Sequence, residues 1–196
     1  MNKFYPQIVF LILLTILFSC KKETEWTPPD NNDEEPGTFE GVPEPANVVM
    51  YEVNLRALST GGDLQGVTGK LDHIESLGVN VIWLMPIHPI GEVNSVNSPY
   101  SVRDYLEVGP EYGTLDDLKE LVDKAHSRDI AVIMDWVANH TAWDNDWITN
   151  KSWYTQDGDG NIIHPPGTNW LDVADLNYDN QEMRAAMIDA MMYWVT

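Results

Sequence analysis

The chain has 196 residues, with 31 acidic against 11 basic side chains and a formal net charge of -20 at pH 7. This length suits one globular domain of modest size with tails. The negative charge repels phosphate backbones and no basic patch is visible, so we expect no nucleic-acid partner. Cys20 is the only cysteine, which excludes an internal disulfide framework.

Residues 1–20 have the pattern of a bacterial export signal. Lys3 precedes an apolar stretch over residues 8–18, which is shorter than the roughly 20 residues that a bilayer span needs. The sequence L-F-S-C at residues 17–20 resembles the lipobox of bacterial lipoproteins, in which the cysteine is lipidated. The pattern predicts an exported protein that a lipid on Cys20 anchors to a bacterial membrane, on the periplasmic or cell-surface side. An ordinary secretory peptide with an incidental cysteine is the alternative.

Residues 21–46 are rich in proline and in acidic and amide side chains. The prolines are Pro28, Pro29, Pro36, Pro43 and Pro45. Little of this segment can be buried, so we expect a disordered, extended tether that holds the folded part away from a membrane surface. The folded part then spans residues 47–196.

Apolar runs predict three strands in the folded part, over residues 48–53, 79–84 and 130–134. They lack strict alternation and helix-like segments separate them, which indicates a parallel sheet in an α/β fold. Both a Rossmann-like sheet and a (β/α)8 barrel fit this order. No G-x-G-x-x-G or Walker A segment follows any strand, which favours the barrel.

Three helices are predicted between and after these strands. The first, near residues 67–77, has one apolar face with Leu71, Ile74 and Leu77, and Gly78 should stop it. The second opens at Thr114, because a threonine followed three positions later by Asp117 forms a capping box. The third starts near Asp179, and its predicted buried face consists of Met183, Met187, Met191 and Trp194.

The segment over residues 135–141, D-W-V-A-N-H-T, follows the third predicted strand directly. In parallel α/β folds, sites are built at the carboxyl ends of strands. An Asp, an Asn and a His within six residues at such a strand end therefore indicate a functional site.

Several motifs in chain order resemble glycoside hydrolase family 13, the α-amylase family. They are Tyr51 to Val53, Gly78 to Pro86, Pro99 to Tyr105, Tyr112 to Thr114, the D-x-x-x-N-H segment at residues 135–140, and Val173 to Asn177. The resemblance covers residues 47–196 and implies a (β/α)8 TIM barrel with a short subdomain, residues 142–171, inserted after strand three. A full barrel typically needs about 250 residues, so we expect a barrel truncated after its third β/α unit.

The resemblance also implies roles for individual residues. Tyr100 would stack on the sugar at the cleavage point, and His140 would donate hydrogen bonds to its hydroxyls. Asp135 would support the site through an arginine on the next strand. Asn139 and Asp175 would be oxygen ligands of a structural Ca²⁺, with a hydrogen-bonded loop anchor as the alternative reading of both.

The resemblance implies a retaining hydrolase that cleaves α-1,4 bonds of starch or maltodextrin. The nucleophile, the acid/base and the stabilising carboxylate of the family follow on later strands, so we expect this chain to be inactive by itself. A neopullulanase, cyclomaltodextrinase or transglycosylase relative is the alternative, as is a non-catalytic glucan-binding protein. Ser101 after Tyr100, where exo-acting relatives usually carry an aspartate, favours an endo-acting cleft.

Two other patterns in the chain predict structure. Asp157-Gly-Asp-Gly-Asn161 begins like an EF-hand loop but has Ile162 at position six and Thr168 at position twelve, so we expect a tight turn. The insertion is rich in aromatic residues, namely Trp143, Trp147, Trp153, Tyr154 and Trp170. We expect most of them to pack the core of the subdomain and some of them to be sugar platforms. Four histidines show no paired metal-ligand spacing, so we expect each of them to be structural or solvated: His73, His88, His126 and His164.

Overall fold

The computed structural model describes residues 39–195. Every described residue belongs to one compact unit, Glu35–Thr196. The predicted export signal, Cys20 and the predicted tether up to residue 38 lie outside the described residues. Over residues 39–195, no helix is both long enough and apolar enough to cross a membrane.

Three parallel strands form the sheet, as the sequence predicts. They are β1 (Met50–Val53), β2 (Val81–Leu84) and β3 (Ala131–Met134), in the order β1-β2-β3. Val53 pairs with Leu84, and Leu84 pairs with Met134. The three strands therefore end level with one another, and the loops that follow them emerge at one edge.

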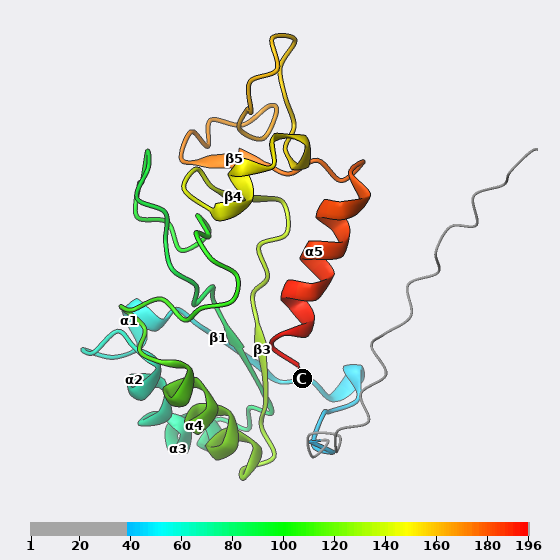
Figure 1. The fold of residues 1–196 in the computed structure, drawn as a ribbon. Helices are drawn as coiled ribbons and strands as arrows, with labels where there is room; N and C mark the ends of the chain where they lie inside the picture. Colours follow the sequence, from blue (N-terminus) through cyan, green and yellow to red (C-terminus); the bar gives the residue numbers. More distant parts are fainter. Residues whose placement is uncertain (1–38, 196) are drawn as a thin grey trace, which may run out of the picture. The chain divides into compact units, whose positions relative to one another are not determined.

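Helices cover one face of the sheet (Figure 1). They are α1 (Leu55–Leu58), α2 (Leu64–Thr68), α3 (Leu71–Ser76) and α4 (Leu115–His126). Their shared core includes Leu64, Val67, Leu71, Ile74 and Leu121, each buried to 1% exposure or less. A short 3-10 helix, η1 (Pro45–Asn47), precedes β1, and Phe39 stacks on His126 with ring centroids 3.9 Å apart.

The single helix predicted near residues 67–77 is two helices in the structure. Gly69 caps α2 and Lys70 precedes α3, because glycine is a weak helix former in helix interiors. Gly78 has a φ of 76° and ends α3 in the left-handed region. Leu77, predicted on the buried face, lies at the C-cap of α3 and is exposed.

The capping box predicted for the second helix is confirmed. Asp117 N donates to Thr114 Oγ1 over 3.2 Å, and Thr114 N donates to Asp117 Oδ2 over 2.8 Å. This exchange satisfies two backbone donors at the start of α4. Hydrogen bonds from Thr114 and Gln65 lower the pKa of Asp117, so the cap stays ionised.

The segment after β3 forms a small subdomain beyond the ends of the strands (Figure 1). It contains an antiparallel pair, β4 (His140–Ala142) and β5 (Val173–Asp175), and two 3-10 helices, η2 (Asp146–Thr149) and η3 (Lys151–Trp153). Its core holds Tyr154, Ala174 and Leu176, together with Val102 and Tyr105 from the loop after β2. The subdomain therefore has a hydrophobic core of its own.

The last helix, α5 (Gln181–Met192), packs on the subdomain core. Asn180 caps it through its side-chain oxygen, which accepts from Met183 N over 3.0 Å. Met183 and Met187 are buried in that core, as predicted. Met191 is 46% exposed, which contradicts the prediction. It lines an apolar hollow of about 530 Å³ beside β3, and Ile133 and Trp194 also line this hollow.

Candidate functional site

Asp135 follows β3 directly, and its backbone continues the parallel ladder because Asp135 N donates to Leu84 O over 2.8 Å. This places its carboxylate at the edge where the three strands end. Oδ2 of Asp135 accepts a hydrogen bond from Tyr100 Oη over 3.0 Å. Among residues 39–195, Tyr100 is the hydrogen-bond partner of the Asp135 carboxylate.

Tyr100 lies on the loop after β2, 35 residues from its partner Asp135. Burial raises the pKa of Tyr100 to about 12, with further contributions from the hydrogen bond to Asp135 and from the charges of Asp135 and Glu52. The phenol therefore stays protonated at neutral pH and donates to the carboxylate. This bond fixes the position of the hydroxyl group and the direction of the ring axis.

His140 begins β4 and is 8% exposed. Burial lowers the pKa of its imidazole, although a backbone group of Tyr100 and the charges of Asp172 and Asp175 act in the opposite direction. His140 is therefore neutral at pH 7. Asn139 Nδ2 lies 3.1 Å from His140 Nδ1. Donation from the Asn139 amide to Nδ1 places the ring proton of the neutral imidazole on Nε2.

A cavity of about 420 Å³ lies between the loop after β2 and the subdomain, within the usual range for ligand pockets. We call it the cleft, and it is lined by Val96, Ser98, Tyr100, His140, Trp170, Asp172 and Val173. Ser98 and Tyr100 also line a second hollow of about 300 Å³, together with Met85 and Tyr112. Tyr100 therefore lines both spaces.

Two buried residues join the walls of the cleft. Ser101 Oγ donates to Asp172 O over 3.1 Å, which ties the loop after β2 to the segment that leads into β5. Tyr105 Oη lies 2.7 Å from Val137 O and 3.1 Å from His140 O and holds the segment between Asp135 and His140. Ser101 is 1% exposed and lies behind the cleft wall.

Asn139 and Asp175 lie next to each other at the start of the β4–β5 pair. Asp175 pairs with His140, and Asn139 O accepts from Leu176 N over 3.1 Å. Among the described residues, neither Asn139 Oδ1 nor the Asp175 carboxylate accepts a hydrogen bond, so both oxygens are available to a hard cation. No group of three or more His, Cys, Asp or Glu side chains over residues 39–195 forms a metal-binding cluster.

The turn predicted at residues 157–161 is confirmed. Asp157 Oδ1 accepts from Asp159 N and from Asn161 N, and Asp157 Oδ2 accepts from the Asn161 side chain. These hydrogen bonds satisfy the carboxylate within the turn and lower the pKa of Asp157. Gln156 and Ile162 then pair across the turn in a short antiparallel bridge.

Comparison with known proteins decides the family. The family described as the alpha-amylase catalytic domain matches this chain over residues 24–165. The chain belongs to the α-amylase family. Its three parallel strands are part of the TIM-barrel catalytic domain of that family.

Individual family members match most of this chain. Alpha-amylase 3 of Dictyoglomus thermophilum is 30% identical over 174 residues, which is 76% of this chain and 34% of that protein. The crystal structure of an alpha-amylase from Lactobacillus plantarum superposes with a TM-score of 0.72 at 42% identity and covers 76% of this chain and 36% of that one. The maltogenic alpha-amylase AmyB from Thermotoga neapolitana has a TM-score of 0.70 at 37% identity, with the same coverage. The chain thus spans about a third of the length of these relatives.

The sequence did not predict the contacts of several residues of this α-amylase-family site. Trp170 and Asp172 line the cleft, and Ser101 and Tyr105 fix its walls. Tyr105 and Ser101 act across the fold. The hydrogen-bond partner of Tyr105 is 32 residues away in the sequence, and that of Ser101 is 71 residues away. Ser101 and Tyr105 lie in the motif over residues 99–105, and Trp170 is one of the aromatic residues of the insertion, but these local patterns do not predict the partners across the fold.

Proposed function

We propose that this chain forms the sugar-binding wall of an exported, retaining α-glucan hydrolase that acts on α-1,4 bonds of starch or maltodextrin. Membership of the α-amylase family supports the reaction class. The observation that carries the proposal is the hydrogen bond from Tyr100 to Asp135, which fixes an aromatic ring beside His140 in the cleft.

The chemistry of these two side chains suits a glucosyl ring. The C–H face of a sugar packs on an aromatic face, which Tyr100 offers without any change of conformation. Neutral His140, with its proton on Nε2, would donate to a hydroxyl oxygen. The chain supplies these binding groups, whereas the reacting carboxylates are expected on later strands, so the chain should bind glucan without cleaving it.

The binding half of the proposal is tested by titrating the full 196-residue chain with maltotetraose in a calorimeter. Tyr100→Ala and His140→Ala should each weaken binding, and Tyr178→Phe, outside the cleft, serves as the matched control. Heat of binding that is absent, or that is unaltered in both alanine variants, would refute the sugar-binding wall.

The catalytic half is tested with soluble starch and a reducing-sugar assay. We expect the chain by itself to release no more reducing ends than a buffer blank. Release above the blank would show that the working carboxylates lie within residues 1–196. Thin-layer analysis of any products would then separate an α-amylase from a transglycosylase.

Calcium and lipid belong to the same proposal. Asn139 and Asp175 would hold a Ca²⁺ ion through their side-chain oxygens, and the ion would brace the junction between β3 and the subdomain. We expect CaCl2 to raise the unfolding temperature relative to EDTA, and Asp175→Asn to remove most of that difference.

Lipid on Cys20 would anchor the protein to a bacterial membrane, and Cys20→Ser should abolish labelling by radioactive palmitate in the producing cell.

A further inference from the structure

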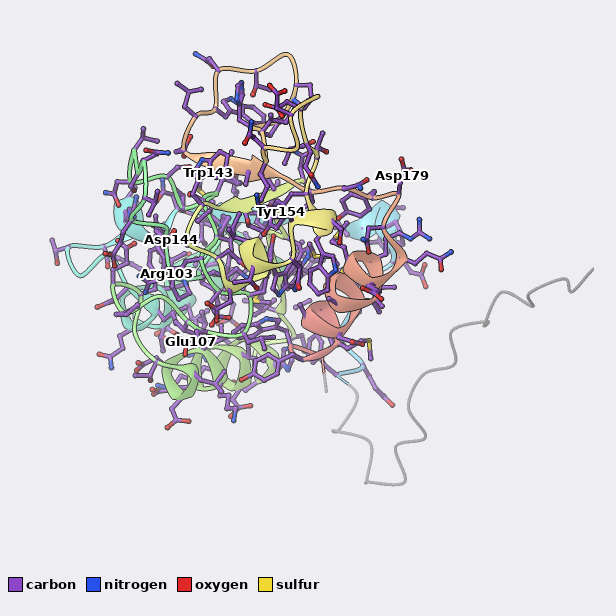
Figure 2. The ribbon with its side chains drawn as sticks, turned by 45° about the horizontal axis from the view of Figure 1, so that its top comes forward. Arg103, Glu107, Trp143, Asp144, Tyr154 and Asp179 are labelled. Carbon is purple, nitrogen blue, oxygen red and sulfur yellow. The ribbon has the colours of Figure 1, made fainter. Side chains whose placement is uncertain are left out.

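The aromatic side chains of the subdomain fall into two groups. Trp143, Trp147, Trp153 and Tyr154 all pack on or within the subdomain core, and Figure 2 shows Trp143 and Tyr154 in this part of the fold. Trp143 also donates from its indole nitrogen to Leu171 O over 3.0 Å. Trp170 differs from them because it is 49% exposed and lies outside that core.

The indole of Trp170 lies against His140. The two ring centroids are 5.7 Å apart at an interplanar angle of 62°, an edge-to-face contact. Both rings line the cleft, and the loop after β2 contributes Tyr100 and Val96 to the same lining. The exposed tryptophan is therefore next to the residues that form the proposed sugar-binding wall.

Trp170 is carried by a tightly hydrogen-bonded turn. Thr168 Oγ1 donates to Pro165 O over 2.7 Å and accepts from Trp170 N over 3.3 Å. His164 Nε2 lies 3.2 Å from Thr168 O. These bonds fix the backbone of Trp170, so little conformational freedom is lost when a ligand packs on the ring.

The part of the loop after β2 that lines the cleft is also held in place. Arg56 donates to Asn97 O over 2.9 Å and to Asn97 Oδ1 over 3.2 Å, and it forms a 2.7 Å ion pair with Glu111. Asn97 adopts a φ of 60°, and Arg56 therefore anchors the strained position of the loop that carries Val96 and Ser98. Hydrogen bonds therefore hold both of the segments that line the cleft.

The polar group beside Trp170 selects the kind of ligand. Asp172 lines the cleft, and over residues 39–195 its backbone oxygen accepts from Ser101 whereas its carboxylate accepts no hydrogen bond. An apolar ligand would desolvate this carboxylate without compensation, and an anion would be repelled by it. A neutral ring with an apolar face and hydroxyl donors fits both the indole and the carboxylate.

We propose that Trp170 is a second sugar platform, which binds the glucosyl unit next to the one held by Tyr100 and His140, with Asp172 accepting from its hydroxyls. The cleft would therefore favour glucans of several units over a single glucose. The inference rests on the proposed function, because it extends the same cleft by one unit.

The test compares four forms of the full chain in calorimetric titrations with maltotetraose: wild type, Trp170→Ala, Trp170→Tyr and Leu171→Ala. Leu171 is the matched control because it is the adjacent residue, is 64% exposed and lies outside the cleft lining. We expect binding to weaken about tenfold in Trp170→Ala, to recover largely in Trp170→Tyr, and to stay unchanged in Leu171→Ala. Thermal unfolding of each variant verifies that the fold is retained.

The possible results separate the two proposals. If wild type and Trp170→Ala bind maltotetraose equally while Tyr100→Ala binds weakly, the second platform is wrong and the sugar-binding wall stands. Equal weakening in Leu171→Ala would also overturn the platform, because it would show a general disturbance of the segment. If wild type does not bind maltotetraose, the proposed function fails and the inference fails with it.

Discussion

The hydrogen bond between Tyr100 and Asp135 permits a quantitative test of the site. Tyr100→Phe removes one donor to a carboxylate, over a distance of 3.0 Å, and keeps the aromatic ring. Hydrogen bonds to charged groups contribute about 1.5–3 kcal/mol. Both side chains are only half-buried, so water replaces part of the lost bond, and we expect a loss of roughly 1–2 kcal/mol in the free energy of unfolding.

A double-mutant cycle isolates this bond from other effects of the substitutions. Urea unfolding of wild type, Tyr100→Phe, Asp135→Ala and the double variant should give a coupling energy of about 1 kcal/mol or more. Tyr178→Phe is the matched control, because Tyr178 Oη donates to Ala138 O and not to the Asp135 carboxylate. Its cycle with Asp135→Ala should be additive.

The reasoning would be refuted by a coupling energy below about 0.3 kcal/mol for Tyr100 and Asp135, since that lies within the scatter of independent sites. Binding provides a second readout. Tyr100→Phe should retain most of its affinity for maltotetraose because the ring remains, whereas Tyr100→Ala should lose it. Equal loss in both variants would show that the hydroxyl, and not the ring face, contacts the sugar.

Three further predictions concern stability. Burial lowers the pKa of His88, so its neutral form stabilises the fold above the unfolded pKa of about 6.5, and this contribution is lost as the pH falls. His88→Gln should therefore reduce the pH dependence of the free energy of unfolding between about pH 7 and 5.5, by at most about 1.4 kcal/mol per pH unit. An equal reduction in His73→Gln, at an exposed histidine, would contradict this. Thr114→Ala should lower the free energy of unfolding by about 1 kcal/mol through loss of the capping box, whereas Ser127→Ala, at the other end of α4, should change it less. Gly91→Ala should lower the free energy of unfolding by about 1–3 kcal/mol, because the added methyl group would overlap Ala142 and Asp144. Gly158→Ala is the control, because Gly158 has open space around it. Equal free energies of unfolding for the two variants would show that the loop adjusts to the methyl group.

The sequence by itself determined the local features of this protein. Apolar runs predicted the three parallel strands, the spacing of Thr114 and Asp117 predicted the cap of α4, and the D-x-x-x-N-H segment identified the family. These signals are local, because strand and helix periodicities and capping patterns act over a few neighbouring residues. The position of Tyr100 and His140 in one cleft also follows the expectation, since loops after parallel strands emerge at one edge.

Only the tertiary structure decided which side chains meet. It gave Asp135 a partner 35 residues away, and it placed Trp170 in the cleft while the other subdomain tryptophans pack on a core. It also placed Met183 and Met187 on the subdomain and left Met191 exposed, although all three belong to one predicted stripe. A helical pattern shows that one face of a helix is apolar. Whether that face is buried depends on which distant segments pack against it, and packing across the whole fold decides this.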